Sequence, residues 1–265
     1  MKMKDLGWIW EGHGMDPGVY PSIFGVGEGA EYFGLEKAVL MFHPNNELLM
    51  KKVSSLKEVI CDISKWKFRN IVDVEGVSVT AVEHWIDGSA VAVCREAKNV
   101  SDLSSKYSNI TGAFHDDMRG LVKRFGCKPE DYKQIYDSLH SINPKLKLWS
   151  CVYTHELSPD EWIGFIPYMD IINLWVWKAE DLPKLDEYLK KCCEIFPSKP
   201  INMGIYLRDY PMKSPVPMHL LKLQMGKILK YIQNSKIQGY TILGACLIDG
   251  QIEQANWVRD FIAAN

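Results

Sequence analysis

The sequence has no uninterrupted apolar run of the length that a membrane span or a signal peptide needs. Asp5 and Glu11 interrupt the N-terminal segment, and no later segment approaches about 20 apolar residues in a row. The lysines are scattered and the formal net charge is −2, so no basic surface for nucleic acid or an anionic membrane is expected. These absences predict a cytoplasmic protein with neither a nucleic acid nor a membrane as its partner.

Cysteines at metal-binding or redox spacing are also absent. The seven cysteines are an odd number and contain no Cys-x-x-Cys motif, which argues against a disulfide framework and against a zinc site. Cys192 and Cys193 are adjacent within a helical pattern, where a free cysteine usually packs as a small buried apolar residue. The cysteines therefore favour a reducing compartment, and no cofactor is predicted.

The chain does contain a regular succession of strand-length apolar segments. Hydrophobic residues make up 47% of the sequence and charged residues 24%, as in globular proteins with a sizeable core. The expected strands are LGWIWEG (6–12), KAVLMFH (37–43), KEVICDI (57–63), ITGAFHD (110–116), LKLWSCVY (146–153), DIINLWVW (170–177), PINMGIYL (200–207) and QGYTILGA (238–245). Because eight strands alternating with helices pair in parallel and close on themselves, the pattern predicts one (β/α)8 TIM barrel domain over residues 1–265.

Helical patterns occupy most of the segments between these strands. They span residues 21–33, 46–56, 87–108, 128–142, 158–169, 181–196, 215–233 and 251–264. Residues 65–86 do not fit, and we expect them to form an irregular excursion between the third strand and its helix, either a lid or a small extra layer. A doubly wound open sheet is disfavoured because no Gly-x-Gly-x-x-Gly turn follows the first strand.

The polar residues at the ends of the expected strands indicate an active site. Alternate side chains of a barrel strand face the interior, and those at the C-terminal ends line the site. In the fourth strand we expect Gly112 and Phe114 to face the helices, which turns His115 and Asp117 inward. The same reasoning on all strands predicts a rim composed of Glu11, His13, His43, Asp62, His115, Asp117, Tyr153, His155, Trp175, Trp177, Tyr206 and Arg208. Because ionisable groups are costly to bury, this rim predicts a polar pocket open to solvent.

The rim combines carboxylates with aromatic rings, as a carbohydrate site requires. Trp175 and Trp177 are the expected platforms for the C–H faces of a sugar, with Trp10 and Tyr206 behind them. Glycoside hydrolysis needs two carboxyl groups, one of which protonates the glycosidic oxygen while the other stabilises or attacks the oxocarbenium-like centre. By strand position the candidate carboxylates are Asp117, Glu156 and Asp116.

The fourth strand ends in Gly112-x-x-x-Asp116-Asp117 and the sixth strand is rich in tryptophan, and together these features resemble TIM-barrel glycoside hydrolases. No single glycosidase family is matched, because an Asn-Glu pair, a DxxDxDxE run and an acid at the end of strand six are all absent. The resemblance implies that Asp117 or Asp116 is one catalytic carboxylate and Glu156 its partner, and that the other rim residues bind a small-molecule or oligosaccharide substrate. The pleat favours Asp117, whereas Asp116 has the alternative of a hydrogen bond to Arg119 or to the following backbone.

Two other functions stay open on these residues. The rim histidines with Asp62, Asp117 and Glu156 are also potential ligands of a divalent cation, as in metal-dependent isomerases, lyases and hydrolases. Against this, the His-x-His that opens amidohydrolase-type barrels is absent, since EGHG supplies only His13. The third possibility is a barrel that binds carbohydrate without turnover, in which an ion pair such as Asp117 with Arg208 would hold the carboxylates.

Overall fold

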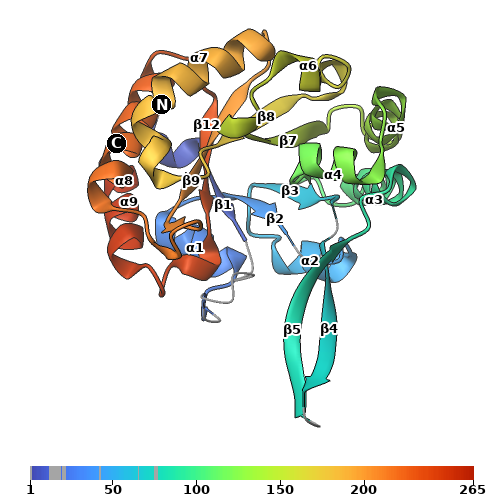
Figure 1. Cartoon of the computed structure of the whole chain (residues 1–265), viewed down its shortest axis with the longest axis horizontal. Helices are drawn as coiled ribbons and strands as arrows, with labels where there is room; N and C mark the ends of the chain where they lie inside the picture. The colour runs from blue at the N-terminus through green and yellow to red at the C-terminus, as the bar shows by residue number, and fades with distance from the viewer. Residues whose placement is uncertain (1, 12–18, 20–21, 42, 65, 75–76) are drawn as a thin grey trace.

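Eight parallel strands form a closed barrel, as the sequence predicts (Figure 1). The computed structural model describes residues 2–11, 19, 22–41, 43–64, 66–74 and 77–265, with 66–86 described by the backbone alone. The barrel strands are β1 (Gly7–Trp10), β2 (Lys37–Leu40), β3 (Glu58–Asp62), β6 (Ile110–His115), β7 (Lys147–Tyr153), β8 (Ile171–Trp175), β9 (Ile201–Tyr206) and β12 (Gly239–Leu243). They follow the order β1-β12-β9-β8-β7-β6-β3-β2, and the pairing of β1 with β2 closes the ring.

Helices connect successive strands and cover the outside of the barrel. They are α1 (Val26–Phe33), α2 (Glu47–Lys52), α3 (Ala90–Ser104), α4 (Met118–Phe125), α5 (Pro129–Leu139), α6 (Pro159–Trp162), α7 (Leu185–Ile195), α8 (Met218–Gln233) and α9 (Ile252–Ala264). Two of these helices have an N-cap side chain. The Asn46 side chain accepts the Leu49 N–H at the start of α2, and the Ser89 side chain accepts the Ala92 N–H at the start of α3. The sequence did not predict α4, and residues 158–169 form only α6 and a short 3-10 turn, η3 (Ile166–Tyr168).

The described part of the excursion predicted over residues 65–86 forms a two-stranded antiparallel hairpin. It consists of β4 (Trp66–Val74) and β5 (Val77–Ile86), whose strands pair with each other and not with the barrel. Figure 1 shows this hairpin projecting away from the barrel beyond α2. A second, much shorter hairpin joins β10 (Arg208–Asp209) to β11 (Ser214–Pro215) just after β9. The prediction of an insertion between the third barrel strand and its helix is therefore confirmed, although its described strands pair as a hairpin and are not irregular.

The register between neighbouring strands determines which side chains fill the barrel. In paired parallel strands, residues opposite each other point to the same face of the sheet. Phe114 lies opposite Asp62 on one side and Trp149 on the other, and its ring packs edge-on against Trp10 at 4.7 Å. His115, in the opposite phase, stacks against Tyr132 of α5. The predicted phase of the fourth strand is therefore wrong, because Gly112 and Phe114 face the interior while His115 faces the helices.

Aromatic rings fill the interior of the barrel. Trp8 packs against Trp149 with ring centroids 5.1 Å apart. Nearer the C-terminal ends of the strands, the Trp175 ring lies 5.5 Å from Trp10 and 4.7 Å from Tyr206. A Cβ atom on Gly204 would stand 2.1 Å from the Trp175 ring, so only glycine leaves room for the indole at this position. These packed rings fill the barrel directly below the C-terminal ends of its strands.

The two ends of the chain lie side by side (Figure 1), and the Met3 N–H donates to the Asn265 carbonyl oxygen at 3.4 Å. Within the described residues, no helix combines the length and the apolar character needed to cross a bilayer.

We predict opposite effects on stability for two glycine-to-alanine substitutions. Gly204→Ala should lower the free energy of unfolding by about 1–3 kcal/mol, because the new methyl group collides with a ring that is already packed on both sides. Gly226→Ala should raise it by roughly 0.5–1 kcal/mol, because Gly226 lies within α8 and a Cβ there meets no atom within 4 Å. Urea unfolding of the two variants and the parent measures both changes. Equal stability of the two variants would show that the interior is not packed as described.

Candidate active site

The end of β6 and the turn that follows it bring two carboxylates to the C-terminal end of the barrel. Asp116 continues the inward phase of Phe114, and it is 9% exposed. Asp117 immediately precedes α4 and has a φ of 45°, in the left-handed region that aspartate tolerates better than most residues. Its side chain does not cap α4. The left-handed turn, rather than the pleat of the strand, therefore brings Asp117 to the site.

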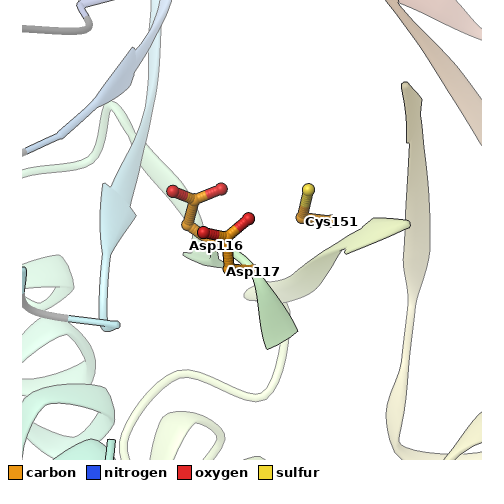
Figure 2. A group of neighbouring side chains, drawn as sticks. All are labelled: Asp116, Asp117 and Cys151. Atoms are coloured by element: carbon orange, nitrogen blue, oxygen red, sulfur yellow. The ribbon is translucent and has the colours of Figure 1, made fainter. Parts of the chain in front are cut away.

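Asp116 and Asp117 lie beside Cys151 of the neighbouring strand β7. Figure 2 shows the two carboxylates close together at the end of β6, with the Cys151 sulfur across from them. One ligand atom from each of these three residues lies within 4.8 Å of the other two. Cys151 is 1% exposed, and burial raises the pKa of its thiol, so the thiol is neutral beside the two acids.

Tyr153 and Glu156 complete the polar centre from the end of β7. The Tyr153 hydroxyl donates to a carboxylate oxygen of Asp117 at 2.7 Å. Glu156 lies in the 3-10 turn η2 (Thr154–Glu156), and its carboxylate accepts the Tyr153 backbone N–H at 3.0 Å. Burial raises the pKa of Glu156, and the nearby charge of Asp117 adds to the increase. Asp117 and Glu156 therefore lie at the same end of the barrel and interact electrostatically.

Aromatic rings border this polar centre on the side of β7, β8 and β9. Trp177 stacks on Tyr210 with ring centroids 5.6 Å apart and an interplanar angle of 11°. Tyr153 stacks on the exposed ring of His155 at 5.3 Å, and Tyr206 contacts both Trp177 and Tyr210 edge-on. Burial lowers the pKa of His155, while the charge of Asp117 opposes the decrease, and the pKa of Tyr206 is raised because its hydroxyl is buried.

The opposite side of the rim is polar, and its groups bind one another. A His43 ring nitrogen lies 2.9 Å from a carboxylate oxygen of Glu11, which joins the ends of β1 and β2. Asp62 is fully buried, and its carboxylate accepts both the backbone N–H and the hydroxyl of Ser64. The structure therefore places Glu11, His43 and Asp62 on the predicted rim, whereas His13 lies outside the described residues.

Two predicted substrate-binding residues are buried away from any ligand. His115 stacks on Tyr132 at 5.7 Å in the helix layer, and complete burial lowers its pKa to about 3, so it stays neutral there. Trp175 points inward as expected but is only 1% exposed, so it supports the floor of the site and offers no open ring face. We therefore assign both residues to packing rather than to direct contact with a substrate.

Arg208 does not continue the pleat of β9, because that strand ends at Tyr206. It is 5% exposed and lines a small cavity together with Tyr206, Trp177 and Gln224. Two further residues of the site, Cys151 and Tyr210, are not among the predicted ones. Cys151 alternates in phase with Trp149 and Tyr153, so the same strand pattern could have predicted it. Tyr210 lies beyond the end of β9, where no strand alternation indicates its direction.

The fold is shared with glycoside hydrolases of known structure. A chitinase from Chromobacterium violaceum superposes with a TM-score of 0.55 at 12% identity, over 98% of this chain and 99% of that one. A β-glucuronidase from Bacteroides uniformis superposes with a TM-score of 0.59 at 10% sequence identity, and the match covers 93% of this chain but 31% of that one. The spore cortex-lytic enzyme SleL from Bacillus cereus superposes with a TM-score of 0.51 at 10% sequence identity, and the match covers 100% of this chain and 75% of that one.

Neither a protein-family model nor a curated protein sequence matches the chain. At these identities the likeness establishes the barrel fold, and it confirms the architectural resemblance expected from the fourth and sixth strands.

The raised pKa of Glu156 predicts a pH-dependent stability. Because its pKa is higher in the folded protein than in the unfolded chain, the resulting stabilisation is present below the unfolded value, near 4.5, and is lost as pH rises through the folded value. Glu156→Gln should therefore gain stability over the parent between about pH 4 and about pH 7. Urea unfolding of both proteins across this range measures the difference.

Glu161→Gln is the matched control with the opposite sign. Lys123 and Arg119 lower the pKa of Glu161 through hydrogen bonds, so the parent gains stability as pH rises toward the unfolded value near 4.5. Relative to the parent, this variant should therefore lose stability as pH rises to about 5 and keep a constant deficit above that pH. If both variants changed in the same direction with pH, the environment described for Glu156 would be incorrect.

Proposed function

We propose that the protein is a glycoside hydrolase that acts on carbohydrate through the carboxylates at the C-terminal end of its barrel. The observation that carries this proposal is the contact of Tyr153 with Asp117, because one tyrosine joins a carboxylate to a group of open aromatic rings. Sugars present flat C–H faces and many hydroxyls, so their sites combine aromatic planes with acids and hydrogen-bonding groups. The C-terminal end is also where TIM-barrel enzymes carry their active sites.

Glu156 and Asp117 fit different roles in this reaction. Burial raises the pKa of Glu156, which favours the protonated form that a general acid needs. Asp117 accepts a hydrogen bond from Tyr153, and such a bond stabilises a carboxylate as an anion. We therefore assign Glu156 as the acid and Asp117 as the anion facing the anomeric carbon, with Asp116 next to it as the second candidate for that role.

The proposed reaction breaks the bond between the anomeric carbon and the glycosidic oxygen. The bonding electrons stay on the oxygen, which takes the proton of Glu156 and leaves as an alcohol. Asp117 stabilises the positive charge that develops at the anomeric carbon, or forms a covalent bond to that carbon that breaks again when water attacks and returns its electrons to the carboxylate. Water then supplies a hydroxyl group to the anomeric carbon, and its remaining proton restores Glu156.

The other rim residues are proposed to hold an oligosaccharide substrate. The exposed His155 ring offers its nitrogens to sugar hydroxyls, and the Trp177 and Tyr206 rings border the same centre. Arg208, also predicted as a substrate contact, lies beside these rings but is only 5% exposed. Glu11 and His43 lie across the rim and are partly exposed, so they are candidates for contacts with a longer substrate. Asp62 was predicted to contact the substrate as well, but it is fully buried and its carboxylate binds Ser64.

Substitution of the two proposed carboxylates tests this assignment. Asp117→Asn and Glu156→Gln should each lower hydrolysis of a responsive glycoside by at least about 100-fold, because each removes a group that acts in the transition state. Asparagine also tolerates the left-handed backbone at position 117. Rates on a panel of chromogenic glycosides measure the effect, with Glu161→Gln as a control expected to stay within about twofold of the parent. Undiminished activity in both test variants would remove the assignment.

A metal-dependent enzyme is the second candidate, and the cluster of Asp116, Asp117 and Cys151 favours it. A thiolate and two carboxylates can hold a divalent transition metal such as zinc, which would act as a Lewis acid at this position. Metal binding would deprotonate the Cys151 thiol, against the effect of burial, which raises the pKa of that group.

Metal analysis separates the two candidates. The hydrolase proposal predicts less than about 0.1 equivalent of transition metal in the purified protein and activity within about twofold after treatment with EDTA. One equivalent of metal, lost in Cys151→Ala together with activity, would establish the second candidate and overturn the first.

A further inference from the structure

Two stacked pairs of aromatic rings meet at a right angle on one side of the rim. The first pair is Trp177 with Tyr210, and the second is Tyr153 with His155. The Trp177 and Tyr153 rings join the pairs, with centroids 5.8 Å apart and an interplanar angle of 84°. We call these four residues the aromatic corner. They come from the segments at the ends of β7, β8 and β9, which are neighbours in the barrel.

The aromatic corner keeps apolar surface in contact with solvent. Trp177 is 37% exposed although it contacts three other rings. No other tryptophan with a described side chain is as exposed. His155 is exposed as well, and Tyr210 is partly so. Packing against one another holds these rings in place, so their open faces are available to a ligand without rearrangement. An open aromatic surface beside a polar cleft is typical of a binding site.

The aromatic corner is continuous with the proposed catalytic centre. Tyr153 contributes to both, because its ring contacts His155 and Trp177 while its hydroxyl donates to Asp117. Across the rim, the described part of the chain offers the Glu11–His43 pair and the Asp62–Ser64 hydrogen bonds instead of open rings. A ligand that extends away from Asp117 therefore finds its apolar support on the β7–β9 side.

We propose that the aromatic corner is a distal subsite that binds a second pyranose ring of an oligosaccharide whose neighbouring ring lies at Asp117. This inference rests on the proposed carbohydrate function and extends it to the class of substrate. The ligand is an unbranched chain of pyranoses with flat C–H faces, of which β-1,4-linked glucose and N-acetylglucosamine are the examples used below, because such faces match a planar ring such as Trp177. The perpendicular second pair contacts the edge of the same sugar, and the exposed His155 ring lies on that side to meet its hydroxyls.

Binding to an inactive protein tests the subsite without turnover. Calorimetric titration of the full chain carrying Asp117→Asn, with cellotetraose and with the tetramer of N-acetylglucosamine as probes, should show saturable binding of at least one of them. Adding Trp177→Leu should weaken that binding about tenfold or more, because leucine keeps apolar volume and removes the planar face. The corresponding monosaccharide reaches the carboxylate end of the site without Trp177, so its affinity should change by less than about twofold.

Trp257→Leu is the matched control. Its ring lies on α9 against Phe261, outside the aromatic corner, so the same substitution there should leave tetrasaccharide affinity within about twofold. His155→Ala is a second test variant at an exposed position, where loss of folding is not expected, and it should weaken tetrasaccharide binding about threefold or more.

Each result supports or overturns the subsite. Failure of both tetrasaccharides to bind, or equal affinities of the Trp177 and Trp257 variants, would overturn it. Binding that depends on Trp177 in a protein that cleaves no glycoside would support the subsite while removing the hydrolase assignment, so the two proposals fail separately.

Discussion

Closure of eight parallel strands is the constraint on which the rest of the structure depends. The hydrogen-bonded register between β6, β7 and β8 places Phe114, Trp149 and Ile171 side by side, and it continues to the residues above them. Each strand therefore ends at a defined position on one common rim. Residues as far apart in the sequence as Asp117, Tyr153 and Trp177 meet there because of this register and not because of their spacing.

The packed interior below the rim gives the site a rigid floor. The Trp10, Phe114, Trp175 and Tyr206 rings fill the barrel up to the level of the carboxylates, with Gly204 leaving space for the indole of Trp175. Polar side chains buried in this interior bind one another: the Asn173 amide donates to the Thr241 hydroxyl, which donates to the Asn202 carbonyl oxygen. The Cys151 thiol is buried as well, and its burial beside two acids keeps it protonated. Rigid aromatic support and a few acids above it are the elements that a sugar site needs.

Much of this architecture is readable from the sequence, for a physical reason. Eight apolar segments at strand length alternate with helical patterns, and few folds other than a barrel can bury that arrangement. The inward phase of Asp62 and Tyr206 is also readable, because the opposite set of side chains in each strand is plainly apolar. Glu156 is predicted only by its position just past the fifth strand. His115 was misplaced because both alternating sets of ITGAFH contain small or apolar residues, so only the neighbouring strands decide the phase.

Other features depend on backbone geometry that no residue pattern encodes. Asp117 leaves the strand through a left-handed turn, so its side chain reaches the site although the pleat does not direct it there. The helix α4 spans only eight residues directly after that turn, which is too short for a clear periodic signal. Tyr210 reaches Trp177 because β10 and β11 form a tight hairpin after β9, and the sequence carries no mark of that return.

The most direct test of the central claim is a crystal structure of the Asp117→Asn variant with a bound tetrasaccharide. We predict one pyranose ring within hydrogen-bond reach, about 2.6–3.2 Å, of Glu156 and of the amide introduced at position 117, and the next ring lying along the Trp177 face. A sugar bound away from the C-terminal end of the barrel, or a metal ion held by Asp116 and Cys151 in place of a sugar, would contradict it.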